Sequence, residues 1–268
     1  RITPRTTGVI GVDVWGRPCA INGLEEIARR RGLKLMFDAA HAFSNSYKGR
    51  MIGNFGHAEV FSFHATKFFN TLEGGAVATN DDDLAGRIRL MKNFGFSGYD
   101  NVIYVGTNGK MNEVCAAMGL TGLDSLQHVI AVNRRNYATY QEGLSGISGV
   151  RLIDYDESER RNYQYVIVEV DADITGISRD LLVDMLHAEN VLARRYFYPG
   201  CHQMEPYCSY FPHAGLLLPE TERLTQRVMS LPTGTAVGPE EIMEVCAIIR
   251  LAIQNRHNLA TRLAMQDM

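Results

Sequence analysis

Short apolar runs alternate with amphipathic helical segments through the first two-thirds of this 268-residue chain, and this alternation restricts the folds that it can adopt. Strand-like runs occupy residues 9–14, 33–37, 60–63 and 76–79. Helical spacing of apolar residues marks 22–31, which Gly32 ends, and a segment from the acidic cap at 81–83 to Lys92. Because a parallel pair of strands needs a crossover connection, strands that alternate with helices form mostly parallel sheets. We therefore predict an α/β fold, with a mostly parallel sheet flanked by helices.

The pattern changes in the second half of the chain. Residues 112–143 predict a long helix, with breaks near Gly119 and Gly122. Beyond Gly149 the apolar spacing predicts strands at 165–170 and 191–197, a helix at 178–189, and a closing helix from Pro239 to Ile249. We expect residues 1–146 to form part of a large domain with its long connecting helix, and residues 147–268 to form a smaller C-terminal α+β domain.

Composition narrows the choice of partners. Hydrophobic residues make up 46% of the chain, charged residues 21%, and the net charge is -3. These values are ordinary for a soluble protein and give no reason to expect nucleic acid or a membrane as partner. No apolar run looks long enough to span a bilayer, so we expect a cytoplasmic protein. The five cysteines are odd in number and lack CxxC spacing, which favours reduced thiols over disulfides or a metal site.

Polar side chains follow two of the predicted strands. Asp38 ends one strand, while Ser62 and Lys67 lie at and beyond the end of another. Because ligands bind at the carboxyl ends of parallel strands, these three residues are site candidates, although a helix cap is the commoner use of an aspartate such as Asp38 taken alone. Lys67 could hold a phosphate as a point charge, or act as a nucleophile if burial lowers its pKa. The residues alone therefore predict a phosphate-bearing ligand near Asp38, Ser62 and Lys67.

Two motifs give these residues a family context. DAAHAF at 38–43 and FSFHATKFFNTLEGG at 61–75 together resemble the DegT/DnrJ-type sugar aminotransferases. The likeness extends to VWGRP at 14–18, NFGF at 93–96, TNGKMNE at 107–113 and RRYFYP at 194–199. The resemblance implies a fold-type I enzyme that uses pyridoxal 5'-phosphate (PLP). The motifs look most like those of enzymes that form dTDP-4-amino-4,6-dideoxyglucose, which implies transfer of an amino group from L-glutamate to dTDP-4-dehydro-6-deoxyglucose.

The resemblance also implies a role for each matching residue. Lys67 matches the lysine that binds PLP covalently and moves the proton at the reacting carbon. Asp38 matches the acid that faces the pyridine nitrogen and keeps it protonated. His41 matches a position beside the ring and its phenolic oxygen, where glutamine is frequent. Ser62 matches a hydroxyl on the cofactor phosphate. Asn108 matches an asparagine that reaches the phosphate of the neighbouring subunit, which implies a homodimer with shared active sites.

Other polar residues have weaker grounds. His202 lies where many relatives have a histidine near the sugar, but a loop histidine with a local hydrogen bond is an equal reading. Arg194 and Arg195 could contact a nucleotide diphosphate, although arginines in such a segment are as often solvated. We interpret His64 as structural. Because the lysine position remains lysine at Lys67, transamination is favoured over dehydration of the sugar.

Two departures from the family pattern stand out. Ser44 follows DAAHAF where glycine is usual, and it costs about 1 kcal/mol if that backbone needs positive φ. Family members also carry a further N-terminal region, so the resemblance implies an N-terminally truncated chain with PLP binding weakened or lost. The alternatives are a PLP-dependent or PMP-dependent sugar dehydratase, and an inactive remnant that serves as a binding module. The glycines of residues 8–16 do not fit GxGxxG, which argues against a nicotinamide-dependent reductase.

Overall fold

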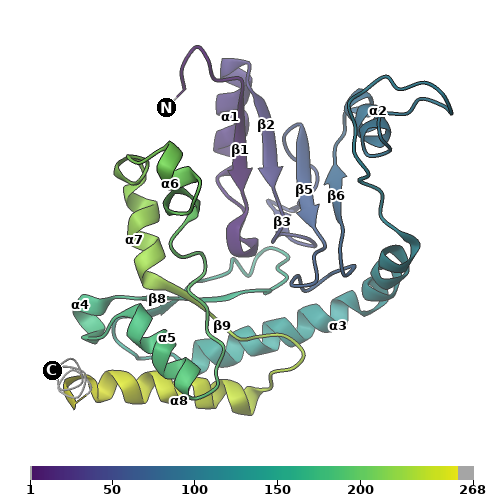
Figure 1. Ribbon diagram of the computed structural model, residues 1–268. Coiled ribbons are helices and arrows are strands. Elements are labelled where there is room, and N and C mark those ends of the chain that lie inside the picture. The colour runs from purple at the N-terminus through teal and green to yellow at the C-terminus, as the bar shows by residue number, and fades with distance from the viewer. Residues whose placement is uncertain (1, 259–268) are drawn as a thin grey trace. The chain divides into compact units, whose positions relative to one another are not determined.

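A computed structural model describes residues 2–258, and the chain divides into two units (Figure 1). The first unit contains the chain up to Ile130 together with Tyr155–Gln164. The second unit contains Ala131–Asp154 and the chain from Tyr165 onward. The helix α3, Glu113–Gly143, begins in the first unit and ends in the second. The segment Tyr155–Gln164 therefore belongs to the first unit although the chain on both sides of it belongs to the second.

The first unit is built on a four-stranded mixed sheet. Its strands, in the order of the sheet, are β1 (Gly8–Val12), β2 (Lys34–Asp38), β5 (Ala58–Ser62) and β6 (Gly75–Ala78). β1, β2 and β5 are parallel, whereas β6 runs antiparallel to β5, as the arrows in Figure 1 show. The α/β class and the largely parallel sheet are therefore confirmed. β6 can reverse direction because a loop, residues 63–74, rather than a crossover helix connects it to β5.

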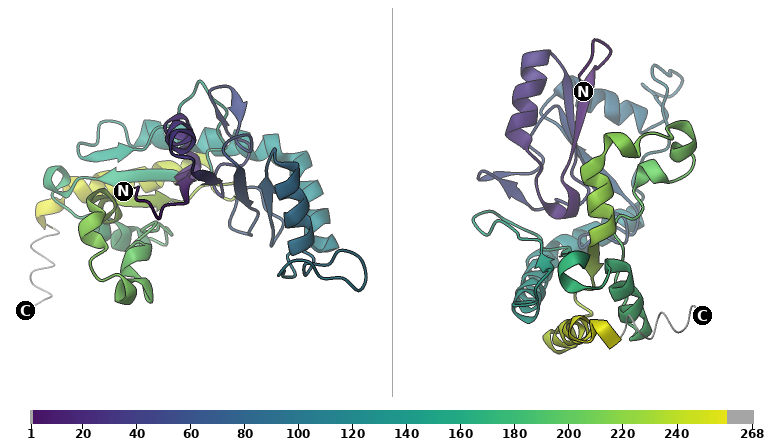
Figure 2. Two further views of the ribbon diagram at one scale, coloured as in Figure 1. Left: turned by 90° about the horizontal axis from the view of Figure 1, so that it is seen from above. Right: turned by 90° about the vertical axis from the view of Figure 1, so that its left-hand side faces the viewer.

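Local signals set the helix ends of this unit. α1 (Ile21–Arg31) ends at Gly32, whose φ of 63° is the left-handed conformation that glycine adopts without strain. The right-hand view of Figure 2 shows α1 running alongside β1. α2 (Asp82–Met91) begins after Asp81, whose carboxylate accepts the backbone N–H of Leu84. A short helical turn, η1 (Val14–Gly16), and a small hairpin of β3 (Ser46–Tyr47) and β4 (Arg50–Met51) complete the unit's regular structure up to α3.

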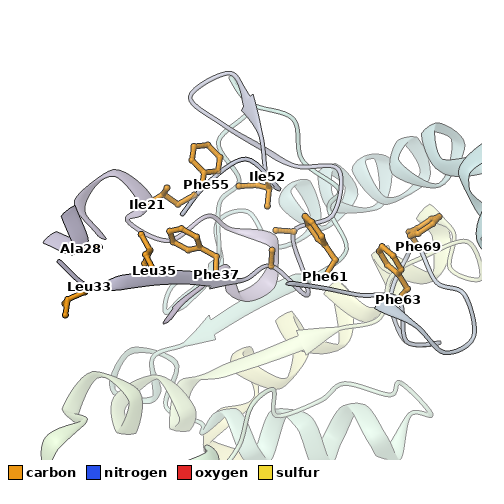
Figure 3. Packing of buried hydrophobic residues seen from close by; sticks show 12 residues of the cluster. Ile21, Ala28, Leu33, Leu35, Phe37, Ile52, Phe55, Phe61, Phe63 and Phe69 are labelled. Atoms are coloured by element: carbon orange, nitrogen blue, oxygen red, sulfur yellow. The ribbon is translucent and has the colours of Figure 1, made fainter. Parts of the chain in front are cut away.

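The core of the first unit extends along one face of the sheet, from α1 to Phe63 and Phe69 (Figure 3). Leu35 and Phe37 of β2 point into this core, while Met36 between them is exposed on the opposite face. This alternation follows from the two-residue period of a strand. Ile21 of α1 and Phe61 of β5 pack into the same cluster. Burying each of these side chains stabilises the fold by about 1.5–3 kcal/mol, which fixes β2 and β5, the two strands that end at the predicted site residues.

The second unit has a three-stranded antiparallel sheet in the order β7 (Val150–Leu152), β8 (Val166–Val170) and β9 (Val228–Leu231). Its helices are α4 (Ala172–Thr175), α5 (Arg179–Ala188), α6 (Tyr207–Tyr210), α7 (Pro219–Arg227) and α8 (Pro239–Gln254), with short turns η2 (Cys201–Gln203) and η3 (Gly215–Leu217). All five residues of β8 are buried, because strands flank it on both sides and α5 packs against α8 and β9.

The predicted breaks in the long helix are wrong, because α3 continues from Glu113 to Gly143. A Cβ atom on Gly119 would lie 2.8 Å from Thr71 Cγ2, and one on Gly122 would lie 3.3 Å from the ring of Phe69. The two glycines therefore allow the helix to approach residues 69–71 closely. The glycines are explained by this close tertiary packing, and they do not mark a helix end.

The predicted strand at 191–197 is also wrong. Only Arg194 forms a β-bridge, in which its backbone exchanges two hydrogen bonds with Ser230 of β9, at 3.0 and 2.8 Å. The chain then turns, since the N–H of Tyr198 donates to the carbonyl of Arg195 at 2.7 Å. β9, which the sequence analysis missed, pairs with β8 instead.

Part of α3 is long and apolar. Within residues 2–258 it contains an 18-residue window that could cross a membrane by length and composition alone, with mean hydropathy 1.2. Only 11% of that window is buried. Length and composition alone do not establish a membrane span, so the expectation that no run spans a bilayer stays a prediction. The exposed apolar residues near its start are Val114, Met118, Leu120 and Leu123.

Candidate active site

The carboxyl ends of β2 and β5 lie side by side. Asp38, the last residue of β2, is in register with Val60 of β5, and the N–H of Ala39 donates to the carbonyl of Val60 at 2.9 Å. Ser62, two residues further along β5, ends that strand at the same edge of the sheet. Because the strands are parallel, their polar terminal residues gather where ligands bind in open α/β sheets.

Asp38 does not cap a helix. Its Oδ1 accepts the N–H of Ala40 at 3.0 Å, and the residues that follow form turns rather than a helix. This local bond orients the carboxylate, and the side chain remains exposed. The structure therefore removes the helix-cap alternative and leaves a carboxylate presented at the strand end.

Lys67 lies in the turn that follows β5. Its N–H donates to the carbonyl of His64 at 2.9 Å, and its side chain is half-buried. Burial lowers the pKa of the Lys67 amine, while the negative charge of Asp38 acts in the opposite direction. The net effect favours the uncharged amine more than at an exposed lysine, which is the condition for nucleophilic or proton-transfer chemistry.

His41 joins Asp38 and Lys67 electrostatically. Burial and the positive charge of Lys67 lower the pKa of the imidazole to about 4, and the charge of Asp38 opposes this shift. The Nδ1 atom of His41 accepts the backbone N–H of Trp15 at 3.1 Å. His41 is therefore neutral near pH 7. The structure brings together an amine, a carboxylate and a neutral imidazole.

Ser62 and His64 shape the turn that carries Lys67. Ser62 Oγ accepts the N–H of His64 at 3.4 Å. His64 Nδ1 accepts the N–H of Thr66 at 3.2 Å and lies 2.9 Å from its hydroxyl. His64 Nε2 is 3.6 Å from the carboxylate of Glu73. These local contacts fit the structural interpretation of His64.

Asn108 lies in the segment between α2 and α3. It forms an isolated β-bridge with Asn93 and lines a cavity of about 710 Å³ beside β6. Lys92 and Lys110 line the same cavity. Within the described part of its own chain, Asn108 makes no hydrogen bond or ion pair with Asp38, Ser62 or Lys67.

His202 lies in the second unit and makes polar contacts there. Its Nε2 is 2.7 Å from Glu222 Oε1, and the side-chain amide of Gln203 donates to the same oxygen at 2.6 Å. These three residues line a cavity of about 360 Å³. The structure thus gives His202 a local partner, as one of the two sequence interpretations expects, and also places it at a cavity.

The two neighbouring arginines have different surroundings. Arg194 lies with its guanidinium 5.2 Å from the centre of the Tyr196 ring. Arg195 is 3.5 Å from Asp180 and 3.8 Å from Asp184. Arg195 is therefore paired with acids in the second unit rather than presented as an uncompensated cation.

A larger cavity, of about 970 Å³, lies away from these residues. Lys34, Leu35 and His57 line it, and they mark the amino ends of β2 and β5. Asp38 and Ser62 are at the opposite ends of the same strands. Size therefore does not identify the candidate site, whereas the polar groups at the carboxyl ends do.

The sequence analysis missed the residues that hold His41 in place. Asn162 donates from Nδ2 to the carbonyls of His41 and Phe43, at 2.9 and 3.0 Å. Trp15 supplies the N–H to the imidazole, and Tyr155 donates its hydroxyl to the carbonyl of Trp15 at 3.0 Å. The VWGRP motif was the only signal in the sequence, and it marked Trp15 without revealing this contact.

The chemistry of these residues fits PLP. Asp38 can pair with a protonated pyridine nitrogen, and Lys67 has the lowered pKa that a covalent attachment needs. Ser62 can donate its hydroxyl to a phosphate. Within residues 2–258, no cluster of three or more His, Cys, Asp or Glu side chains could hold a metal ion.

Curated relatives place this chain among sugar aminotransferases. The pattern of the DegT/DnrJ/EryC1/StrS aminotransferase family matches residues 1–250. The dTDP-4-amino-4,6-dideoxy-D-glucose transaminase of Shigella dysenteriae is 31% identical over 249 residues, covering 93% of this chain and 67% of the relative. The Escherichia coli relative of the same name is 30% identical over 251 residues, covering 92% and 67%.

Solved structures of sugar aminotransferases are also similar to this chain. The structure of DesI in the presence of its TDP-sugar product has a TM-score of 0.91 at 52% identity, covering 98% of this chain and 66% of that one. The structure of S. venezuelae DesV in complex with a ketimine intermediate has a TM-score of 0.85 at 30% identity, covering 94% and 66%. The chain thus spans about two thirds of the length of these relatives.

These likenesses confirm the family resemblance, the fold-type I architecture and PLP as the cofactor, all of which the motifs predicted. The family match extends over nearly all of the chain and includes both motifs that carry Asp38 and Lys67. The chain belongs to the DegT/DnrJ/EryC1/StrS aminotransferase family.

Proposed function

We propose that this protein is a PLP-dependent aminotransferase that moves an amino group from L-glutamate to a nucleotide-linked keto-deoxy sugar. The observation that carries the proposal is the cluster of Asp38, His41 and Lys67, in which burial favours the uncharged lysine amine beside a carboxylate. Few structural roles require a half-buried lysine at this edge of a sheet. Proton transfer does require a lysine whose amine can lose its proton, and burial favours this.

Each site residue has a definite task in this proposal. PLP, when bound, supplies an electron sink for the electrons released at the substrate carbon. Asp38 holds the proton on the pyridine nitrogen, because its negative charge stabilises the protonated form. Lys67 attaches the cofactor and then carries a proton to and from the reacting carbon. Ser62 donates its hydroxyl to the cofactor phosphate.

We propose dTDP-4-dehydro-6-deoxyglucose as the amino acceptor. The support is the name of the two curated relatives, dTDP-4-amino-4,6-dideoxy-D-glucose transaminase, and the TDP-sugar product of DesI. His202, Arg194 and Arg195 remain the candidates for binding the sugar nucleotide. Because Arg195 contacts Asp180 and Asp184, its use for a diphosphate requires these ion pairs to open.

A homodimer with shared sites is part of the proposal. The surface of the first unit near Asn108 is apolar and exposed: Tyr99 is 99% exposed, Val105 93%, Val114 70% and Leu120 68%. Monomeric proteins rarely leave so much apolar surface in contact with water, so a second copy is the natural cover. Asn108 would then reach the cofactor phosphate of the other subunit. We also propose a cytoplasmic location, where nucleotide sugars are available.

One assay tests the function. Protein is incubated with PLP, L-glutamate and a panel of 4-keto and 3-keto nucleotide sugars, and 2-oxoglutarate and amino sugar are measured. Equal amounts of both products with a 4-keto substrate are expected. Loss of a sugar hydroxyl without 2-oxoglutarate would indicate the dehydratase alternative. Absence of both products together with absence of PLP binding would indicate the non-enzymatic remnant.

A further inference from the structure

The turn at Trp15 and Gly16 has an unusual backbone. Trp15 has φ 58° and ψ 22°, and Gly16 has φ 74°. Positive φ is costly for a large L residue, by about 1–2 kcal/mol, so surrounding contacts must hold Trp15 in this conformation. The turn points the N–H of Trp15 at Nδ1 of His41, at 3.1 Å.

Buried side chains hold the turn from two sides. The hydroxyl of Tyr155 donates to the carbonyl of Trp15 at 3.0 Å, and Nδ2 of Asn45 donates to the carbonyl of Gly16 at 2.7 Å. Both side chains are buried. A Cβ atom on Gly16 would lie 2.9 Å from the carbonyl oxygen of His41. The turn and the loop that carries His41 are therefore packed backbone against backbone.

The same segment that supplies Tyr155 also fixes the loop of His41. Asn162, which is fully buried, donates from Nδ2 to the carbonyls of His41 and Phe43. Its Oδ1 accepts the N–H of Gln164 at 3.1 Å. Tyr155–Gln164 thus fixes both partners of the hydrogen bond between Trp15 and His41.

A backbone N–H can only donate, so His41 Nδ1 must accept. A neutral imidazole with an acceptor Nδ1 carries its proton on Nε2. We propose that the Trp15 amide, held by Tyr155, is a positioning element that fixes His41 as the neutral Nε2–H tautomer. On the proposed function, His41 then presents a hydrogen-bond donor and no positive charge beside Asp38. The charge of Asp38 stays available for the pyridine nitrogen of PLP.

The two charged groups around His41 act on its pKa in opposite directions, and burial of the ring adds to the effect of Lys67. Lys67 and the burial of the ring lower the pKa of His41, and Asp38 alone opposes them. The neutral imidazole therefore predominates across the neutral pH range, and the N–H of Trp15 selects its Nε2–H tautomer. His41 contributes geometry and a donor, and it does not take part as a cation.

Nitrogen-15 NMR tests the inference without substrate. The full chain carries labelled histidine, and the His41 signals are identified as those absent in His41→Gln. Long-range proton–nitrogen correlations distinguish a bare Nδ1 from a protonated one. A bare Nδ1 and a protonated Nε2 are expected from about pH 8 down to about pH 5. An Nδ1–H tautomer, or protonation near the ordinary histidine pKa of about 6.5, overturns the proposal.

A pair of tyrosine variants isolates the role of the Trp15 turn. Tyr155→Phe removes only the hydroxyl that donates to Trp15, and Tyr163→Phe removes a hydroxyl 2.8 Å from Glu157 in the same segment. The apparent pKa of His41 is expected to rise by about one unit in Tyr155→Phe, as the Trp15 donor loosens, and to stay unchanged in Tyr163→Phe. An unchanged His41 in Tyr155→Phe, or equal shifts in both variants, contradicts the assignment.

The outcome is separable from that of the proposed function. The NMR experiment reads the tautomer of His41 whether or not any amino group is transferred. If His41 is the Nε2–H tautomer but the protein releases no 2-oxoglutarate, the proposed function is contradicted and the positioning role is not. An Nδ1–H tautomer in an active aminotransferase would sink the positioning role alone.

Discussion

Each of the two units buries one glutamate in a strand, and the two carboxylates are treated in opposite ways. Glu59 of β5 accepts the N–H groups of Gly53 and Phe55, and burial raises its pKa to about 7. Glu169 of β8 is also buried, which by itself raises its pKa, but hydrogen bonds from Arg151 and Arg223 outweigh burial and lower it. Among the residues that the structure describes, no cation of the first unit offsets the burial of Glu59, so its pKa is raised. In the second unit two arginines offset the burial of Glu169, so its pKa is lowered.

The difference extends to the predicted site. Arg227 pairs with Asp171 at 3.0 Å in the second unit. In the described part of the first unit, Asp38 and Lys67 form no ion pair within 4.0 Å, and burial controls the charge of Lys67. Ion pairs fix charge states and suit a scaffold. Burial of Lys67 without an ion pair lowers the pKa of its amine, which suits catalysis.

The largest effect is expected for Lys67→Ala. Turnover should fall by more than about a thousandfold, because no other amine can attach PLP and carry the proton. Borohydride should trap the cofactor covalently on the wild type and not on this variant. Lys48→Ala, which removes an exposed lysine of the same unit, is the matched control and should remain active. A covalent label on Lys48 or Lys92 would show that the attachment site is wrong.

The second largest loss of activity is expected for Asp38→Asn. The amide cannot hold the proton on the pyridine nitrogen, so kcat should fall at least about a hundredfold while substrate affinity changes little. Asp171→Asn is a control from the second unit: it breaks the pair with Arg227, and asparagine can still cap α4. Its activity should stay near that of the wild type. If kcat were unaltered in Asp38→Asn, the role of Asp38 would be limited to its hydrogen bond within the turn.

The third prediction concerns the shared site of the dimer. One subunit carries Lys67→Ala and the other carries Asn108→Asp, which places a like charge beside a phosphate. Each homodimer should be nearly inactive. In a mixed dimer one site has both lesions and the other has neither, so activity should return to about half of the wild type. If activity does not recover after the two variants are mixed and reassembled, Asn108 is not part of a shared site.

The buried glutamates give a fourth prediction. Between about pH 4.5 and pH 7 the folded protein keeps a proton on Glu59 that the unfolded chain has lost, so stability falls as pH rises through this window. The full effect is about 3 kcal/mol. Glu59→Gln should remove this slope, because one amide oxygen can still accept both backbone N–H groups. Denaturant unfolding at a series of pH values measures it.

Glu169→Gln is the matched comparison for that measurement. Because the pKa of Glu169 is lowered, its stabilising effect is present above the unfolded pKa and is lost as pH falls. Replacing it should therefore destabilise the protein at neutral pH, where Glu59→Gln stabilises it. Equal changes for both variants would contradict the contrast between the two units.

Local chemistry explains how much of the fold was predictable. α1, α2 and α5 were predicted because their ends depend on adjacent residues: Gly32 is left-handed, Asp81 caps Leu84, and Ser178 accepts the N–H of Leu181. The helix breaks in α3 were wrong because its glycines serve contacts with residues far away in sequence. The strand at 191–197 was wrong because only Arg194 pairs with β9 before the chain turns at Tyr198, and β9 itself was missed.

The candidate site divides in the same way. Asp38, Ser62 and Lys67 were predictable because each follows a strand. Tyr155 and Asn162 were not, since their bonds to Trp15 and His41 span 140 and 121 positions of the chain. Nothing in the residues around 155–164 shows that this segment returns to the first unit. A sequence reading thus finds the candidate groups at the strand ends before it finds the residues that hold them in position.

The smallest effect is expected at Ser44. The sequence analysis noted serine where relatives have glycine, and the structure gives Ser44 a φ of 67°, in the left-handed region. Ser44→Gly should relieve about 1 kcal/mol of backbone strain, partly offset by the greater freedom of glycine in the unfolded chain. It also removes a weak contact, 3.4 Å, between the Ser44 hydroxyl and Arg160. The net gain in unfolding free energy is therefore less than about 1 kcal/mol, and Ser44→Ala, which keeps the strain and loses only the hydroxyl, should show no gain. If the alanine variant were stabilised as much as the glycine variant, the burial of the hydroxyl, and not the positive φ, would be the source of the strain at this turn.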